Sequence, residues 1–147
     1  DVQSMRYTGK RVAAVATGKL GVEDVFYFRA VGNYADRFGK KYAYSKKMRE
    51  TDMQVAKQMS TIYGYKLQEG FAEEHARGML PFDYRQNFVL TFNLRSAMHF
   101  LDLRSKLDAQ SEIIDLCNLL VPVLQQWAPE VVNWYIEKRL GRARLSP

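Results

Sequence analysis

Residues 74–104 constrain the fold of this chain more than any other stretch, because they combine a helix stop, an alternating segment and the start of a second helix. Pro81 has no N–H to donate and clashes with the preceding turn, so a helix that contains Arg77 must end before it. Apolar residues at 88, 90 and 92 then alternate with the residues at 89, 91 and 93, which is the period-2 pattern of a half-buried strand. The stretch therefore predicts a short helix over 71–79, a strand over 87–93 and a further helix after that strand.

The N-terminal half of the chain predicts a small sheet and one long helix. Residues 5–17 mix basic and β-branched residues and predict a short strand. Residues 24–31 predict a second strand, which pairs with 41–44 across a turn. Ser45 is the predicted N-cap of a long helix that Gly70 ends. The predicted buried stripe of this helix is Val55, Met59, Ile62 and Leu67.

The C-terminal part of the chain predicts two more helices. Asp108 is the predicted N-cap of a helix through about Trp127, and Pro129 begins the last helix, as a proline at the first helical position does. Cys117 lies on the apolar stripe of the first of these helices, where a thiol behaves as a small hydrophobic group. Together the patterns predict a single domain of the α/β class in its mixed α+β sense. A small antiparallel or mixed sheet packs against long helices, and the C-terminal part is helical.

Charge and composition narrow the function. The net charge of +6 favours negatively charged partners, and nucleotides, nucleic acids and acidic membranes all fit on charge alone. The one cysteine excludes an internal disulfide framework and suits a reducing compartment, so we expect a cytoplasmic protein. The sequence has no run of 18 apolar residues, and we expect no membrane span. It has no glycine-rich nucleotide motif, and its histidines and cysteine lack zinc-ligand spacing, so we expect no metal.

Polar and cationic side chains lie at the exit of the predicted strand and along the helix after it. These are Asn93, Arg95, His99 and Arg104. Such groups are well placed to hold an anionic ligand. The structural alternatives are a packing role for His99, an exposed ion pair between Glu74 and Arg77, and an ion pair between Arg104 and Asp108. The alternative function is a basic helical module that binds nucleic acid or protein without catalysis.

Four short motifs of this region resemble those of a known enzyme family. They are ARGMLP at 76–81, TFNLR at 91–95, HFLDLR at 99–104 and AQSEI at 109–113. In this order and at these intervals they resemble the C-terminal half of the flavin-dependent thymidylate synthases. The start of the chain is similar to the end of the family signature R-H-R-x-x-S-x-N-x-x-S-x-R, with Asp1, Ser4 and Arg6 on its last N, S and R. Asp1 departs from the asparagine of that signature. The resemblance implies that residues 1–147 are the C-terminal fragment or ordered part of a longer subunit.

The resemblance also implies an activity, partners and residue roles. The family converts dUMP to dTMP, with FAD as cofactor, NADPH as reductant and methylenetetrahydrofolate as the one-carbon donor, and without a cysteine nucleophile. It forms a homotetramer with active sites shared between subunits, and nucleic acid and membranes are not expected partners. Ser4, Arg6, Arg77 and Arg104 are the implied dUMP-binding residues, and Arg104 is also the implied catalytic residue. Asn93, Arg95 and His99 are the implied FAD-binding residues, and the position of His99 holds either histidine or asparagine in the family.

Overall fold

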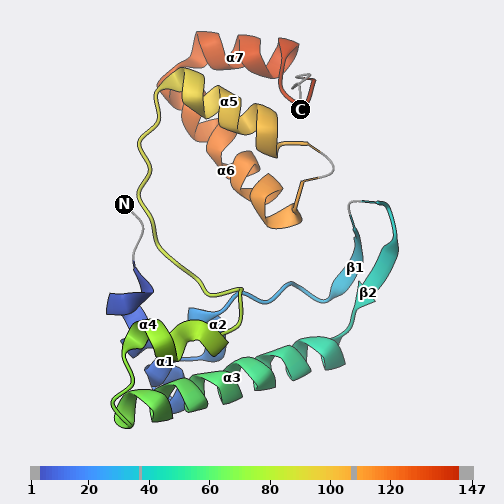
Figure 1. The fold of residues 1–147 in the computed structure, drawn as a ribbon. Coiled ribbons are helices and arrows are strands. Elements are labelled where there is room, and N and C mark those ends of the chain that lie inside the picture. The colour runs from blue at the N-terminus through green and yellow to red at the C-terminus, as the bar shows by residue number, and fades with distance from the viewer. Residues whose placement is uncertain (1–3, 37, 107–108, 143–147) are drawn as a thin grey trace. The chain divides into compact units, whose positions relative to one another are not determined.

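The computed structural model describes residues 4–36, 38–106 and 109–142, and it divides the chain into two compact units (Figure 1). The first unit is Asp1–Tyr34 with Tyr42–Leu90, and the second is Ala35–Lys41 with Thr91–Pro147. The predicted mixed class is confirmed, because long helices are combined with one small antiparallel sheet. No helix within the described ranges is long and apolar enough to cross a membrane. The grouping of residues 1–147 into a single domain stays a prediction.

The first unit is built on one long helix. The helices of this unit are α1 (Met5–Ala16), α2 (Val22–Val25), α3 (Lys46–Gln68), α4 (Glu73–Ala76) and the 3₁₀ turn η1 (Arg77–Met79). Helix α1 packs along α3 and also contacts α4, as Figure 1 shows. The buried core of this unit consists of Val12, Val15, Val25, Phe26, Ala56, Tyr63 and Ala76. The predicted helix over 71–79 corresponds to α4 continued by η1, and its end before Pro81 is confirmed.

The predicted strand over residues 5–17 is wrong, because these residues form α1. The β-branched residues that suggested a strand have helical spacing. Thr8, Val12 and Val15, at i, i+4 and i+7, are all buried. Packing of this stripe against α3 outweighs the weak preference of valine and threonine for strands.

The predicted strand over residues 24–31 is also wrong. Helix α2 ends at Val25, and Phe26 forms an isolated antiparallel bridge with Tyr84. The amide of Tyr27 donates to the carbonyl of Asp83 (2.8 Å), so this segment pairs with residues 83–85 and not with 41–44. The sheet of the described chain consists of β1 (Gly32–Ala35) and β2 (Lys41–Tyr44), of which only the second was predicted.

The cap of α3 is confirmed, but its buried stripe is not the predicted one. The buried residues are Ala56, Ser60 and Tyr63, one position away from the predicted Val55 series. Val55 itself is 44% exposed. Two of the three buried residues are small, and the Ser60 hydroxyl is satisfied because it donates to the carbonyl of Ala56 (2.8 Å). The predicted series lies next to the buried stripe, and its member Leu67 packs against the core as a partly buried residue.

Replacement of Ser45 with alanine should lower the free energy of unfolding by about 1 kcal/mol. The Ser45 hydroxyl accepts a hydrogen bond from the amide of Met48 (3.2 Å), which otherwise has no partner within the helix. Urea unfolding followed by circular dichroism measures this loss. Thr61→Ala is the matched control, because that exposed hydroxyl only bonds back to the Lys57 carbonyl. Equal losses in both variants would contradict the role of the cap.

The second unit is a three-helix cluster formed by α5 (Leu94–Arg104), α6 (Ser111–Trp127) and α7 (Pro129–Lys138). Its buried apolar core consists of Ala97, Leu101, Cys117, Leu124, Val132 and Tyr135. The predicted start of α7 at Pro129 is confirmed. The predicted N-cap Asp108 lies outside the described residues, and Gln110 precedes α6 without a side-chain cap.

The predicted strand over residues 87–93 is wrong, because the structure assigns no strand there. Val89 is 73% exposed and Leu90 is 54% exposed, so neither side of the alternating segment is buried. A half-buried strand needs a neighbouring strand and a core to cover its apolar face. Phe88 takes part in a single β-bridge, and the sheet of the described residues contains only β1 and β2, so the segment does not extend into a strand of a sheet.

Candidate functional site

The predicted site residues divide between the two units. Ser4, Arg6 and Arg77 belong to the first unit, at the start of α1 and in η1. Asn93, Arg95, His99 and Arg104 belong to the second unit, where all four lie on or next to α5. The structure thus brings the predicted flavin-binding residues and the predicted catalytic arginine together on one helix. Asp1, the first residue aligned with the signature, lies outside the described residues.

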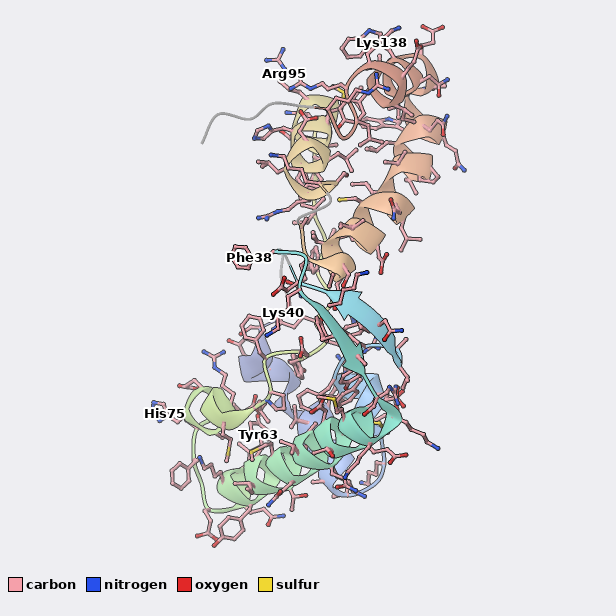
Figure 2. The ribbon with its side chains drawn as sticks, turned by 90° about the vertical axis from the view of Figure 1, so that its right-hand side faces the viewer. Phe38, Lys40, Tyr63, His75, Arg95 and Lys138 are labelled. Atoms are coloured by element: carbon pink, nitrogen blue, oxygen red, sulfur yellow. The ribbon has the colours of Figure 1, made fainter. Side chains whose placement is uncertain are left out.

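The start of α5 presents a set of hydrogen-bond donors. Asn93 is the N-cap of α5, and its Oδ1 accepts from the amide of Ser96 (2.8 Å), which commits the oxygen and leaves the amide NH₂ out of the cap. Arg95 and His99, at i and i+4, are both exposed. Arg95 projects from the first turn of the helix (Figure 2). An amide, a guanidinium and an imidazole within the first two turns of α5 suit a ligand rich in acceptors.

Arg104 is exposed at the last turn of α5. Its apolar neighbours in the sequence favour a buried guanidinium that needs an anionic partner, but the buried residues of this turn are Leu101 and Asp102, while Leu103 is 42% exposed. Burial therefore does not require an anionic partner for Arg104. A cation at a helix C-terminus is favoured by the helix dipole, which accounts for Arg104 in the absence of a ligand.

In the first unit, two buried polar atoms lie close to the backbone of α1. The Tyr63 hydroxyl and Glu73 Oε2 are both buried, and neither has a hydrogen-bond partner in the described part of the chain. Burial, followed by the Glu73 carboxylate, raises the pKa of Tyr63 to about 12, and the positive charge of Arg77 opposes this shift. Arg77 and Glu73 therefore both lie in the electrostatic surroundings of Tyr63. Glu74, at i−3, is exposed and forms no ion pair with Arg77.

Tyr63 was not found from the sequence, because its position depends on how α3 packs on α1 and no local pattern marks it. Figure 2 shows Tyr63 on α3. Tyr84 also contributes to the raised pKa of Tyr63; its hydroxyl lies 3.2 Å from that of Thr8, which donates to the Ser4 carbonyl (3.3 Å). Ser4 is thereby tied to the first turn of α1, the helix that also contains Arg6. The start of the chain and the surroundings of Arg77 are thus linked through α1.

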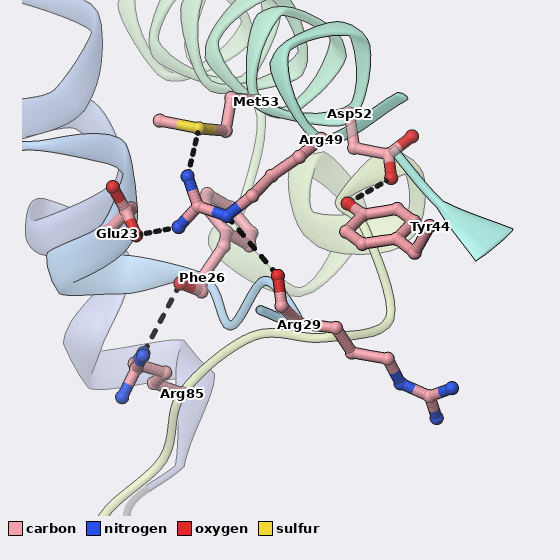
Figure 3. A network of polar contacts seen from close by, with 8 residues as sticks. All are labelled: Glu23, Phe26, Arg29, Tyr44, Arg49, Asp52, Met53 and Arg85. Atoms are coloured by element: carbon pink, nitrogen blue, oxygen red, sulfur yellow. Dashed lines mark hydrogen bonds and ion pairs between the residues drawn. The ribbon is translucent and has the colours of Figure 1, made fainter. Parts of the chain in front are cut away.

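A polar network fastens α3 to the segment that follows α2 (Figure 3). Arg49 forms an ion pair with Glu23, and its Nε donates to the carbonyl of Arg29 (3.2 Å). Tyr44 donates to Asp52 (2.7 Å), and burial together with this hydrogen bond raises the pKa of Tyr44 to about 12. Cations in the first turn of a helix oppose its dipole and can indicate an external anionic partner. In α3, however, Arg49 has its partners within the unit. This network supports the fold and not a binding site.

Comparisons with known proteins agree with the motifs. The family model described as thymidylate synthase complementing protein matches residues 1–130. A flavin-dependent thymidylate synthase of Halobacterium salinarum is 35% identical over 154 residues, which cover 100% of this chain and 62% of the relative. That of Haloarcula marismortui is 30% identical with the same coverage, and that of Thermotoga neapolitana is 30% identical over 69% of this chain and 47% of its own length. The chain thus spans 62% of the length of the two relatives that cover it completely.

The family match covers both units, from the start of α1 to the start of α7, and includes every predicted site residue. The two relatives that cover the whole chain carry the same name. The exposed donors on α5 and the arginine beside Tyr63 therefore lie in a chain that belongs to the family of flavin-dependent thymidylate synthases.

Proposed function

We propose that this chain supplies part of the active site of an enzyme that converts dUMP to dTMP, with methylenetetrahydrofolate as carbon donor and NADPH as reductant. The observation that carries the proposal is the row of exposed donors on α5, in a chain of this family. The enzyme is a methyltransferase that works without a cysteine nucleophile. We place it in the cytoplasm, in keeping with its single buried cysteine.

Asn93, Arg95 and His99 are the proposed FAD-binding residues. The flavin ring presents carbonyl oxygens and ring nitrogens, and the pyrophosphate presents anionic oxygens, so an acceptor-rich cofactor fits an amide, a guanidinium and an imidazole. When bound, FAD supplies the reducing equivalents that it takes from NADPH. The side chains of α5 hold and orient it, and their exposure in the chain alone leaves them available for this contact.

Ser4, Arg6, Arg77 and Arg104 are the proposed dUMP-binding residues. A guanidinium offers a planar fork that suits phosphate and uracil carbonyl oxygens. Arg77 lies close enough to Tyr63 for its positive charge to oppose the rise in the pKa of that tyrosine. Arg104 stabilises the negative charge that develops on the uracil ring when C5 attacks the one-carbon unit, which is the usual role of a fixed cation in such a site.

We also propose that the enzyme is a homotetramer with active sites shared between subunits. Large apolar side chains are exposed in each unit. In the first they include Phe82 (101%) and Val89 (73%), and in the second Leu119 (72%), Trp127 (62%) and Trp134 (54%). Exposed apolar surface of this kind is typical of faces that another chain covers. Sedimentation of the full-length subunit tests the tetramer directly.

The activity is tested by assaying the purified full-length subunit for flavin absorption, for dUMP binding and for dTMP formation with NADPH and methylenetetrahydrofolate. We expect all three. A colourless protein without dUMP affinity that binds DNA with a steep salt dependence would instead support a basic nucleic-acid-binding module.

Replacement of Cys117 with alanine should leave most of the dTMP formation intact and lower the free energy of unfolding by about 1 kcal/mol. Cys117 is 1% exposed and lies in the apolar core of the second unit, where substrate cannot reach its sulfur. Turnover and thermal unfolding of the full-length variant measure the two effects. A loss of several orders of magnitude in turnover with the fold intact would show that the thiol is the nucleophile.

A further inference from the structure

A buried carboxylate joins α5 to α7. Asp102 lies on α5 and is only 4% exposed. Its Oδ1 is 2.9 Å from the Tyr135 hydroxyl, and its Oδ2 accepts from Nε (2.9 Å) and Nη2 (2.8 Å) of Arg139. Tyr135, itself fully buried, comes from α7, and Arg139 directly follows that helix. Both oxygens of one carboxylate are therefore held by the same neighbouring element.

The hydrogen-bonding states of this trio are well defined. The single hydrogen of the Tyr135 hydroxyl has two acceptors within reach, Asp102 Oδ1 and the Met98 carbonyl at 3.2 Å, and the charged oxygen is the stronger one. Burial, then the hydrogen bond to Asp102, raises the pKa of Tyr135, so the phenol remains a donor. The same carboxylate raises the pKa of Arg139. Tyr135 and Arg139 therefore both keep their protons and remain hydrogen-bond donors to the carboxylate.

Such an arrangement is a poor device for stability alone. The Asp102 carboxylate loses its hydration when it is buried, whereas the Arg139 side chain stays half exposed, so much of the attraction between the two charges is offset by the cost of desolvating the carboxylate. What the ion pair adds is direction, because a fork of two N–H groups meets one carboxylate in a narrow range of geometries. The contacts of Asp102 therefore constrain the rotation and the axial position of α5 near its C-terminal end.

The helix held in this way is the one that bears the proposed ligand-binding side chains. Asp102 is three residues after His99 and two before Arg104, and it lies two turns beyond Arg95 on the same side of the helix. Arg95, His99 and Arg104 are exposed. Asp102 is buried although it shares a side of the helix with Arg95, because its carboxylate contacts Tyr135 and Arg139. A small rotation of α5 would displace all three exposed side chains together.

We propose that Asp102 is a positioning residue, and that its contacts with Tyr135 and Arg139 hold α5 so that Arg95, His99 and Arg104 meet flavin and nucleotide in productive geometry. This inference rests on the proposed function. It assigns to Asp102, Tyr135 and Arg139 no contact with substrate or cofactor. Misplacement of a reacting group by 1 Å can lower a rate by ~100-fold, so a loosened helix should have a measurable effect.

The test uses the full-length enzyme and the variant Asp102→Asn, which keeps the shape of the side chain and removes its charge. We expect a folded protein in which the flavin dissociation constant rises about tenfold and kcat falls about tenfold. Both quantities are measured at a temperature well below the melting temperature of the variant. Hydrogen exchange of α5 amides should become faster in the apoprotein. Arg139→Gln should cause the same kind of loss. The loss in Arg139→Lys should be smaller but not absent, because lysine keeps the charge and lacks the planar fork of a guanidinium.

Controls separate positioning from plain stability. Glu137→Gln removes a carboxylate from an exposed ion pair with Lys138 on α7 and should change none of these quantities. If Asp102→Asn does not fold, Tyr135→Phe, which keeps the ring and leaves the Arg139 pair in place, should still weaken flavin binding. A folded Asp102→Asn enzyme with only a lower melting temperature, and with wild-type flavin affinity and kcat, overturns the inference. A wild-type enzyme that neither binds flavin nor forms dTMP overturns the proposed function itself, and the inference with it.

Discussion

Replacement of Arg104 with alanine is expected to lower dTMP formation by about a hundredfold or more while the enzyme stays folded. Arg104 is exposed at the C-terminal turn of α5, so its removal leaves no cavity and no unpaired buried group. Helix α5 loses only the interaction of one cation with its dipole, which is typically worth about 0.3–1 kcal/mol. The loss in rate should therefore greatly exceed the loss in stability, and single-turnover assays beside thermal unfolding measure both.

The step that Arg104 affects can also be resolved. The Arg104→Ala enzyme should still bind flavin and still allow NADPH to reduce it, because Asn93, Arg95 and His99 remain. Arg104→Lys should restore only part of the rate, since an ammonium cannot reproduce the planar fork of a guanidinium. Lys138→Gln, which removes an exposed cation from α7, is the matched control and should be close to wild type. Near-normal dTMP formation by folded Arg104→Ala enzyme would refute the assignment.

The helices of this chain were predictable where their ends carry local chemistry. Ser45 caps α3 with its hydroxyl, and Pro129 begins α7. Such signals act within one turn and need no tertiary contact. The strands were not predictable in the same way, because a strand exists only when a partner lies beside it. Residues 5–17 and 24–31 have the composition of strands, yet they became a helix packed on α3 and an isolated bridge to Tyr84.

The candidate site also combines features that local sequence predicts with features that depend on tertiary contacts. Helical spacing within 94–104 puts Arg95 and His99 on one face of α5, whereas the exposure of Arg104 was seen only in the structure; the contacts of all three with flavin and nucleotide stay predictions. Neither Tyr63 beside Glu73 nor the Asp102 contact with Arg139 has a local signature, because each joins residues from elements apart in sequence. Helical spacing predicts that Asp102, at i+7 from Arg95, shares the face of the exposed Arg95 and His99. Only the tertiary structure shows that Asp102 is buried.

Replacement of Gly9 with alanine should lower the free energy of unfolding by roughly 2 kcal/mol, although Gly9 lies inside a helix. In an exposed helix the same change is favourable by about 1 kcal/mol, because alanine loses less backbone entropy than glycine. Here the new Cβ would lie 1.9 Å from the Tyr63 hydroxyl and 3.0 Å from Glu73 Oε2. Tyr63 is 1% exposed, so its ring has little room to move aside. Overpacking of a core costs about 1–3 kcal/mol, and more for an overlap this severe, so the collision outweighs the gain in propensity.

The collision can be separated from every other effect of the methyl group. Gly64→Ala on α3 is the matched control, because its Cβ meets only Ala16 at 3.8 Å, and this variant should be neutral or more stable. Tyr63→Phe removes the overlapping oxygen, which is buried without a partner in the described chain, and should itself cost little. In the Gly9→Ala, Tyr63→Phe double variant the nearest remaining atoms are about 3.0 Å away, so part of the lost stability should return. The coupling energy from the four unfolding curves measures that return. A double variant as unstable as the sum of the two single changes would show that contact with the Tyr63 hydroxyl is not why glycine occupies this position.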